Sequence, residues 1–213
     1  TDSSGNIMVG GSFKGTYNNT AVNRAFFLNP NGTIKADFDM GSGPGSASVF
    51  ALANTSEGSW YIGGSFSVFD GQNQGRLAKV NAAGEHDTGY LASGVGFDNP
   101  VQKVLSLENE KTMVFGNFTK FNGVLTSRII RLSEDGSYDA TFNSDQFGAN
   151  NLIKTAVLQT DGKIVLGGSF TKYNGRTCNR IVRILPDGEI DNTFNIGSGF
   201  KAQVYAMAMQ DNK

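Results

Sequence analysis

The stretch that decides the fold is DGKIVLGGSF, residues 161–170, because near copies of its second half recur along the chain. The copies read MVGGSF at 8–13, YIGGSF at 61–66 and VFGNF at 114–118. Two further landmarks recur every 52 residues: the arginines Arg24, Arg76, Arg128 and Arg180, and the turn glycines Gly32, Gly84, Gly136 and Gly188. A fixed period of this length indicates supersecondary units that are stacked or arranged radially.

Each unit has the pattern of short β-strands. In the last full copy, residues 163–166 form an aliphatic run, and residues 179–185 alternate polar and apolar side chains with period two, as a half-buried strand does. Pro186-Asp187-Gly188 then predicts a tight turn, and residues 189–194 predict the returning strand. A further strand is expected at 204–209, equivalent to 49–53, 101–107 and 153–158. The chain is therefore predicted to be all-β.

Four short antiparallel strands in about 50 residues, repeated in series, are typical of a β-propeller blade. A β-solenoid is the alternative, but its rungs usually need only about 20 to 30 residues. We therefore predict an all-β propeller with four blades of four strands. We expect the chain to form a single domain, residues 1–213, whose repeats run approximately over 1–55, 56–108, 109–160 and 161–213.

The two ends of the chain are offset from the blades. The first repeat lacks the strand that opens the others, and the last repeat is followed by a spare one at Val204–Met209. Pairing of this spare strand with Ile7–Val9 would complete the first blade and remove two exposed sheet edges. A closed four-bladed ring is one prediction, and an excerpt of a longer propeller is the alternative.

The amino-acid composition limits the binding partners and the location that are expected for the protein. The chain has 28 glycines, 16 phenylalanines, a charged fraction of 17% and a formal net charge of −1. This balance argues against a general nucleic-acid binder, and no run is long enough for membrane insertion. Abundant Asn, Ser, Thr and Gly in place of Lys and Glu favour an extracellular, cell-surface or virion location.

The sequence offers little catalytic chemistry. It contains one histidine, His86, in a strand position that the other repeats fill with isoleucine or tyrosine, and one cysteine, Cys178. A Ser-His-Asp or Cys-His site would have to use this one histidine, and a zinc site would find only one His and one Cys as ligands. We therefore predict no enzyme, no metal and no cofactor. A secreted propeller lyase or glycosidase is the alternative, and it would need a cluster of acid and base groups that is unique in the chain.

Charged residues that recur by repeat are interpreted as structural. Asp87, Asp139 and Asp191 each follow the turn glycine by three residues and are expected to cap backbone N–H groups in the hairpin. The segments 135–139 and 187–191 could alternatively bind Ca²⁺ through Asp and backbone oxygens. The recurring arginines are expected to pair with carboxylates or loop carbonyls rather than to form an anion-binding ring.

Several of these sequence segments, taken together, resemble a known repeat. Residues 161–170, followed by YNG at 173–175, NRI at 179–181, PDG at 186–188 and DNTF at 191–194, resemble the delta-sixty repeat. The resemblance covers essentially the whole chain and is strongest in the fourth copy. It implies a β-propeller of the kind found in bacterial surface and secreted proteins and in some phage structural proteins. It brings no catalytic or ligand-binding residues.

Binding is expected where the repeats differ. The inter-blade loops 39–48, 91–100, 143–151 and 195–203 are the most divergent segments, and flexible loops on a rigid scaffold commonly carry specificity. Phe97, Phe147 and Phe200 in these loops are the predicted ligand anchors, with burial as plugs the alternative. We predict a non-catalytic interaction module on a cell surface or virion appendage, such as a phage tail or fibre, that binds a glycan or protein. A structural assembly element contacting neighbouring subunits is the alternative.

Overall fold

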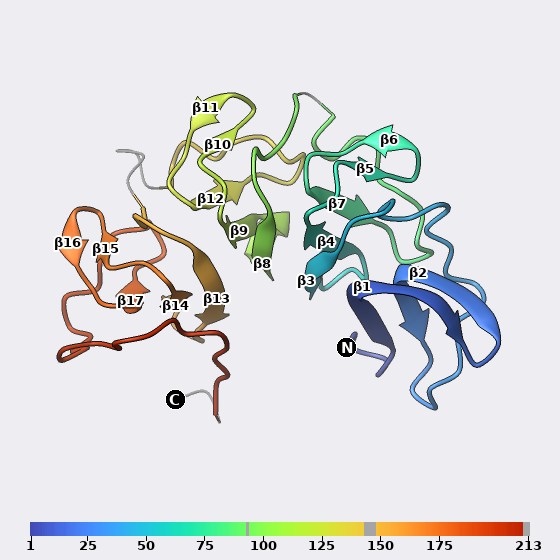
Figure 1. Ribbon diagram of the computed structural model, residues 1–213, viewed down its shortest axis with the longest axis horizontal. Coiled ribbons are helices and arrows are strands. Elements are labelled where there is room, and N and C mark those ends of the chain that lie inside the picture. Colours follow the sequence, from blue (N-terminus) through green and yellow to red (C-terminus); the bar gives the residue numbers. More distant parts are fainter. Residues whose placement is uncertain (93, 143–147, 211–213) are drawn as a thin grey trace.

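The structure is a computed structural model that describes residues 1–92, 94–142 and 148–210. In these ranges the regular structure is β-strand, apart from one short 3-10 turn, η1, at Glu108–Glu110. The four repeats form small antiparallel sheets that follow one another along an open arc (Figure 1). The predicted all-β architecture is confirmed.

Repeats two, three and four each contain a three-stranded antiparallel sheet, in the orders β3-β4-β7, β8-β9-β12 and β13-β14-β17. The strands are β3 (Val49–Asn54), β4 (Trp60–Gly64), β7 (Leu77–Val80), β8 (Val101–Ser106), β9 (Thr112–Gly116), β12 (Ile129–Leu132), β13 (Ile153–Leu158), β14 (Ile164–Gly168) and β17 (Ile181–Ile184). The first strand of each sheet lies on the inner side of the arc (Figure 1).

The predicted fourth strand of each blade is shorter than expected. It is reduced to a single bridge that joins Ile184 to Ile190 in the last repeat, and the same bridge occurs in the other repeats. The strand ends there because the Asp191 carboxylate accepts the backbone N–H of Thr193 at 2.9 Å and turns the chain. Repeats two, three and four therefore each have three full strands and a rudimentary fourth.

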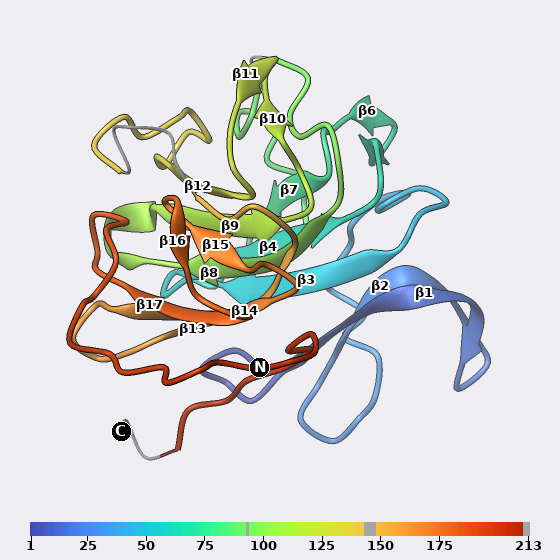
Figure 2. The same ribbon diagram turned by 60° about the vertical axis from the view of Figure 1, so that its left-hand side comes forward.

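A small hairpin is inserted before the third strand of each of these sheets. The hairpins are β5 (Val68–Phe69) with β6 (Gln72–Asn73), β10 (Lys120–Phe121) with β11 (Val124–Leu125), and β15 (Lys172–Tyr173) with β16 (Arg176–Thr177). Both central turn residues of each hairpin have positive φ, as at Asn122 (48°) and Gly123 (81°), which is the type I′ geometry that closes two-residue hairpins. The hairpins stand out from the main sheets (Figures 1 and 2).

The first repeat folds differently. Its strands β1 (Ile7–Tyr17) and β2 (Thr20–Leu28) form one continuous hairpin, closed at Asn18-Asn19 and interrupted by a register shift between Gly10 and Lys14. Within the described ranges β1 pairs with β2 alone. The other edge of β1 therefore has no strand beside it.

The hydrophobic core lies between neighbouring repeats. Strands β4, β9 and β14 are buried at every position. β4 and β9 lie between two neighbouring sheets, whereas β14 has the third repeat on one face and the irregular segment that contains Val204 and Met207 on the other. One core cluster, for example, joins Tyr61 and Leu77 of the second repeat to Val104 and Phe118 of the third. Equivalent clusters join the first repeat to the second and the third to the fourth.

The expected pairing of the two chain ends is not formed in this structure. Val204–Met209, predicted as a strand, has no strand assignment, and the two ends of the arc do not meet (Figure 1). The Val204 N–H instead donates to the Gly168 carbonyl of its own repeat at 3.1 Å. The pairing with Ile7–Val9 is therefore corrected to an open arrangement.

Candidate interaction surface and inter-blade clefts

The hairpins present a set of surface positions that repeats in backbone and varies in side chain. We define the hairpin row as residues 18–21, 70–73, 122–125 and 174–177. The two residues after each turn are exposed in every repeat. They are Thr20-Ala21, Gln72-Asn73, Val124-Leu125 and Arg176-Thr177. A constant backbone thus carries four different pairs of side chains.

Hydrogen bonds hold the hairpins to the loop that precedes each blade. The N–H of Asp70 donates to the Gly43 carbonyl at 2.8 Å, and the N–H of Asn122 donates to the Gly96 carbonyl at 2.9 Å. The fourth repeat has the equivalent bond, 3.0 Å long, from Asn174. The exposed pairs are therefore presented by a rigid support rather than by free loops.

The third hairpin carries an apolar spot. Val124 and Leu125 are 57% and 66% exposed, and Val95 of the adjoining loop is 77% exposed. Val95 is held beside the hairpin because the N–H of the next residue, Gly96, donates to the Asn122 side chain at 2.8 Å. Exposed apolar side chains that gather at one place are typical of an interaction site.

The recurring arginines brace the loops that support this surface. All four have a positive φ, between 63° and 71°, which is uncommon for residues other than glycine. Arg128 Nη1 donates to the Ala149 carbonyl at 3.1 Å, and Arg76 contacts the carbonyl of Phe97 in the same way. The predicted pairing with loop carbonyls is confirmed. These residues are Arg24, Arg76, Arg128 and Arg180.

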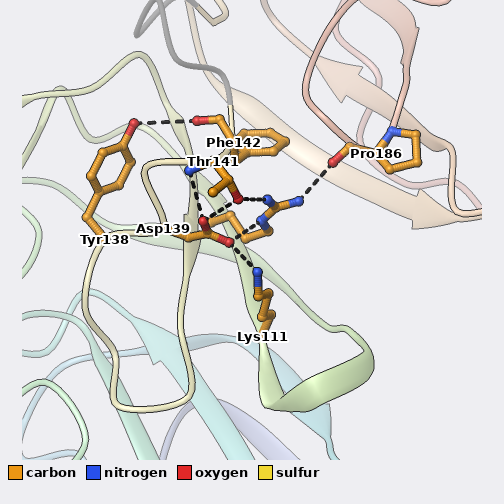
Figure 3. A network of polar contacts seen from close by, with 7 residues as sticks. Lys111, Tyr138, Asp139, Thr141, Phe142 and Pro186 are labelled. Carbon is orange, nitrogen blue, oxygen red and sulfur yellow. Dashed lines mark hydrogen bonds and ion pairs between the residues drawn. The ribbon is translucent and has the colours of Figure 1, made fainter.

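The recurring aspartates cap hairpins, as predicted, and two also form ion pairs. Asp139 Oδ1 accepts the backbone N–H of Thr141 at 2.9 Å, while Oδ2 contacts Lys111 at 2.8 Å and Arg131 at 2.7 Å (Figure 3). Asp191 has the matching partners in the fourth repeat, and Asp87 caps two N–H groups in the second. These bonds occupy the carboxylates that the calcium alternative would require.

The surroundings of Asp139 keep it ionised. Burial raises the pKa of this carboxyl, but hydrogen bonds from Lys111, Thr141 and Arg131 outweigh burial and hold the pKa well below its ordinary value. A folded-state pKa below the unfolded one stabilises the protein above the unfolded pKa, and the contribution is lost as the pH falls.

Replacing Asp139 by asparagine should lower the free energy of unfolding at pH 7 by about 2 kcal/mol, because Lys111 and Arg131 lose a charged acceptor. The difference from the unchanged protein should shrink as the pH falls below about 3.9. Urea unfolding at several pH values measures both effects. Asp37→Asn is the control, since Asp37 pairs with Lys35 at an exposed position and its loss should cost little. Equal losses for the two variants would contradict the prediction.

The three predicted aromatic anchors do not share a surface. Phe97 is 1% exposed and packs between Phe118 and Phe121, with ring centroids 4.5 and 4.9 Å away. It is a core residue, which corrects its prediction as an anchor. Phe147 lies outside the described residues. Phe200 is 51% exposed at the end of the arc.

The single histidine and the single cysteine are packed as structural residues. His86 bridges to Val80, lies 5.0 Å from the Phe69 ring and contacts the Gln74 side chain, and burial lowers its pKa. Cys178 is 3% exposed, and burial raises the pKa of its thiol to about 11. A thiol in this state is a poor nucleophile at neutral pH.

Two polar clefts lie between neighbouring repeats. One, of about 570 Å³, is lined by Lys79, Asp87, Tyr90 and residues 133–137. Lys79 contacts Glu110 at 3.3 Å and lies over the Tyr90 ring, so its charge is already paired. The other, of about 530 Å³, has an acidic lining beside His86. Within the described residues no group of His, Cys, Asp and Glu is arranged to hold a metal ion.

Comparison with known families supports this architecture. The family described as "Domain of unknown function (DUF5122) beta-propeller" matches three segments of the chain, residues 55–90, 110–142 and 159–194. The matches fall at the same place in three successive repeats. The matched segments therefore support a β-propeller fold for the chain.

Comparisons with individual proteins add little to this assignment. No curated protein matches the chain. A solved structure of a protein of unknown function from Bacteroides caccae matches with a TM-score of 0.46 and 13% sequence identity. The match covers 88% of this chain and 56% of the other, so the chain spans little more than half the length of that protein. In the described residues, no helix is long and apolar enough to cross a membrane.

Proposed function

We propose that this propeller is a non-catalytic interaction module that binds a protein partner through the hairpin row. The observation that carries the proposal is the set of exposed, repeat-specific residue pairs on hairpins of constant geometry. A rigid scaffold lowers the entropy that binding costs, and variable side chains at fixed positions provide specificity.

The apolar spot at Val95, Val124 and Leu125 favours a protein partner over a glycan. Aliphatic side chains gain affinity by removing apolar surface from water, whereas sugars are usually bound by aromatic faces and hydrogen bonds. Interfaces commonly depend on a few such central residues surrounded by polar ones. The neighbouring hairpins supply the polar surroundings through residues such as Gln72 and Arg176.

The non-catalytic role is supported by the surroundings of the residues that could act as nucleophile, acid or base. Cys178 is buried, the half-buried His86 packs its ring against Phe69, and the carboxylates of Asp139 and Asp191 are paired with cations. The resemblance to the delta-sixty repeat and the low charged fraction of 17% further support display on a cell surface or a virion appendage.

Replacing Val124 and Leu125 together by aspartate should reduce binding to the natural partner at least tenfold, because two charges then replace the apolar contact. The fluorescently labelled chain is titrated onto intact cells of the organism that encodes it, and the bound fraction is measured. Both side chains are exposed, so the variant should keep the melting temperature of the unchanged protein.

The matched control is Ser3→Asp with Ser4→Asp, an adjacent exposed pair outside the hairpin row, which should bind normally. Treatment of the cells with protease should abolish binding of the unchanged chain. Loss of binding after periodate oxidation but not after protease would point to a glycan and overturn the choice of a protein partner. Absence of saturable binding by the unchanged chain would contradict the module itself.

A further inference from the structure

Phe200 occupies a position that is covered in the other repeats. Its backbone N–H donates to the Asn179 carbonyl at 2.9 Å, as Phe97 does to Gly75 and Ala149 to Ser127. Phe97 and Ala149 are then bridged by the hairpin of the following blade, at Phe121 and Tyr173. These two positions are each 1% exposed, whereas Phe200 is 51% exposed. Phe200 therefore lies where a further hairpin would pack.

The segment after Phe200 also lies at a position that an element of the following blade occupies in the other repeats. A Cβ built on Gly63 meets Val101 and Val104, the first inward residues of the next blade's inner strand. A Cβ built on Gly167 meets Val204 at 2.8 Å and Met207 at 3.2 Å. The Val204–Met209 segment thus lies against the fourth repeat as the inner strand of a following blade would.

The opposite end of the arc offers the matching elements. Tyr17 takes the place of Phe69, Phe121 and Tyr173, the aromatic residues that cover the preceding loop elsewhere. Its hydroxyl donates to the Gly32 carbonyl at 2.9 Å, just as Tyr173 donates to Gly188 at 3.0 Å. Tyr173 is fully buried, but Tyr17 is only half-buried and lines an apolar groove of about 410 Å³ with Phe13 and Phe26.

We propose that these two ends bind each other between copies of this chain, head to tail. The β1–β2 hairpin of one copy would cover Phe200 of a second copy, and the Val204–Met209 segment of that second copy would pair along the free edge of β1. The contact repeats the inter-blade interface that is present three times within the chain. It shares the first hairpin, residues 18–21, with the hairpin row and leaves the other three hairpins free.

The internal interfaces specify the contacts. The N–H of Asn122 donates to the carbonyl of Gly96, which has φ 70°. Gly199 stands at the equivalent place with φ 68°, so in the second copy its carbonyl is expected to accept the N–H of Asn18 in the first copy. Arg180 Nη1, now 3.5 Å from the Phe170 carbonyl, would turn to the Phe200 carbonyl as Arg128 does to Ala149. An unpaired strand edge beside an apolar groove favours such an addition.

A second copy is the occupant because both elements are present in every chain while the ends of one arc stand apart (Figure 1). Two different surfaces that recognise each other form a heterologous contact, which closes into a ring or continues as a filament. The 213-residue chain should therefore be monomeric only at low concentration. Sedimentation velocity across a hundredfold range of concentration should show a dimer or a larger species.

Two variants separate the two surfaces. Phe200→Asp removes the aromatic side chain that would be covered, and Tyr17→Asp removes the ring that would cover it. Each variant alone should therefore be monomeric. A mixture of the two should form a heterodimer, because one intact contact remains between them. Leu125→Asp, which changes the hairpin row but neither end, should assemble as the unchanged chain does. Circular dichroism and thermal unfolding verify that each variant is folded.

Three results would overturn the proposal. The unchanged chain could remain monomeric at every concentration, which would leave the two ends without affinity for each other. Phe200→Asp could lower the melting temperature without any change in mass, which would indicate that the ends of a single chain meet. The two variants could each assemble alone or fail to assemble when mixed, which would exclude a head-to-tail contact.

Discussion

Replacing Phe97 by alanine should lower the free energy of unfolding by about 3–5 kcal/mol, the usual cost of emptying a buried aromatic site. The side chain is 1% exposed, and its ring packs against Phe118 and Phe121. Its neighbours belong to a blade whose strands are fixed by backbone pairing, so they cannot collapse fully into the cavity. Urea denaturation followed by circular dichroism measures the change.

Phe50→Ala is the matched control. Phe50 is 45% exposed on β3, where it lies near Lys154, and its truncation should cost less than about 1 kcal/mol. A similar small loss at Phe97 would show that this ring is dispensable for the fold, and it would return Phe97 to consideration as a binding residue.

The burial of Phe97 could not be predicted from the repeat alone. The equivalent residues are Gly45 and Ala149, and the structure adds Phe200 to the set. Whether a side chain at this position is buried or exposed depends on the hairpin of the following blade. The sequence of the loop itself carries no information about that hairpin. An aromatic residue in a divergent loop therefore fitted a ligand anchor and a core plug equally well.

Other elements could be predicted from the sequence because they depend on residues close to them in the chain. Turn glycines such as Gly136, with φ 81°, and aspartate caps such as Asp139 depend on residues a few positions away. The hairpin turns also had a signal, since Asn-Gly at 122–123 and 174–175 is the strongest short hairpin pattern. The arrangement of the two ends depends on curvature summed over all blades, and no short segment encodes it.

Gly168→Ala should lower the free energy of unfolding by about 3 kcal/mol, because the added methyl group has no room. A Cβ at this position would lie 2.1 Å from the carbonyl oxygen of Leu152, a backbone atom that already accepts the N–H of Ser169 at 2.9 Å. The register of β13 on β14 shifts between Ile153 and Thr155 at this point. The glycine pair at 167–168 thus marks both a bulge and a close backbone approach.

Gly15→Ala separates crowding from the general cost of losing a glycine. Gly15 lies in strand β1, and no atom lies within 4 Å of the place that an added methyl group would take, so this variant should be as stable as the unchanged protein, or more so. Gly64→Ala should instead match Gly168→Ala, because its Cβ would lie 2.1 Å from the Ser48 carbonyl oxygen. Thermal unfolding at one low protein concentration compares the three variants. Equal stability of Gly168→Ala and Gly15→Ala would mean that the bulge can widen freely, and that the repeated glycine is a preference of the sequence and not a requirement of the blade.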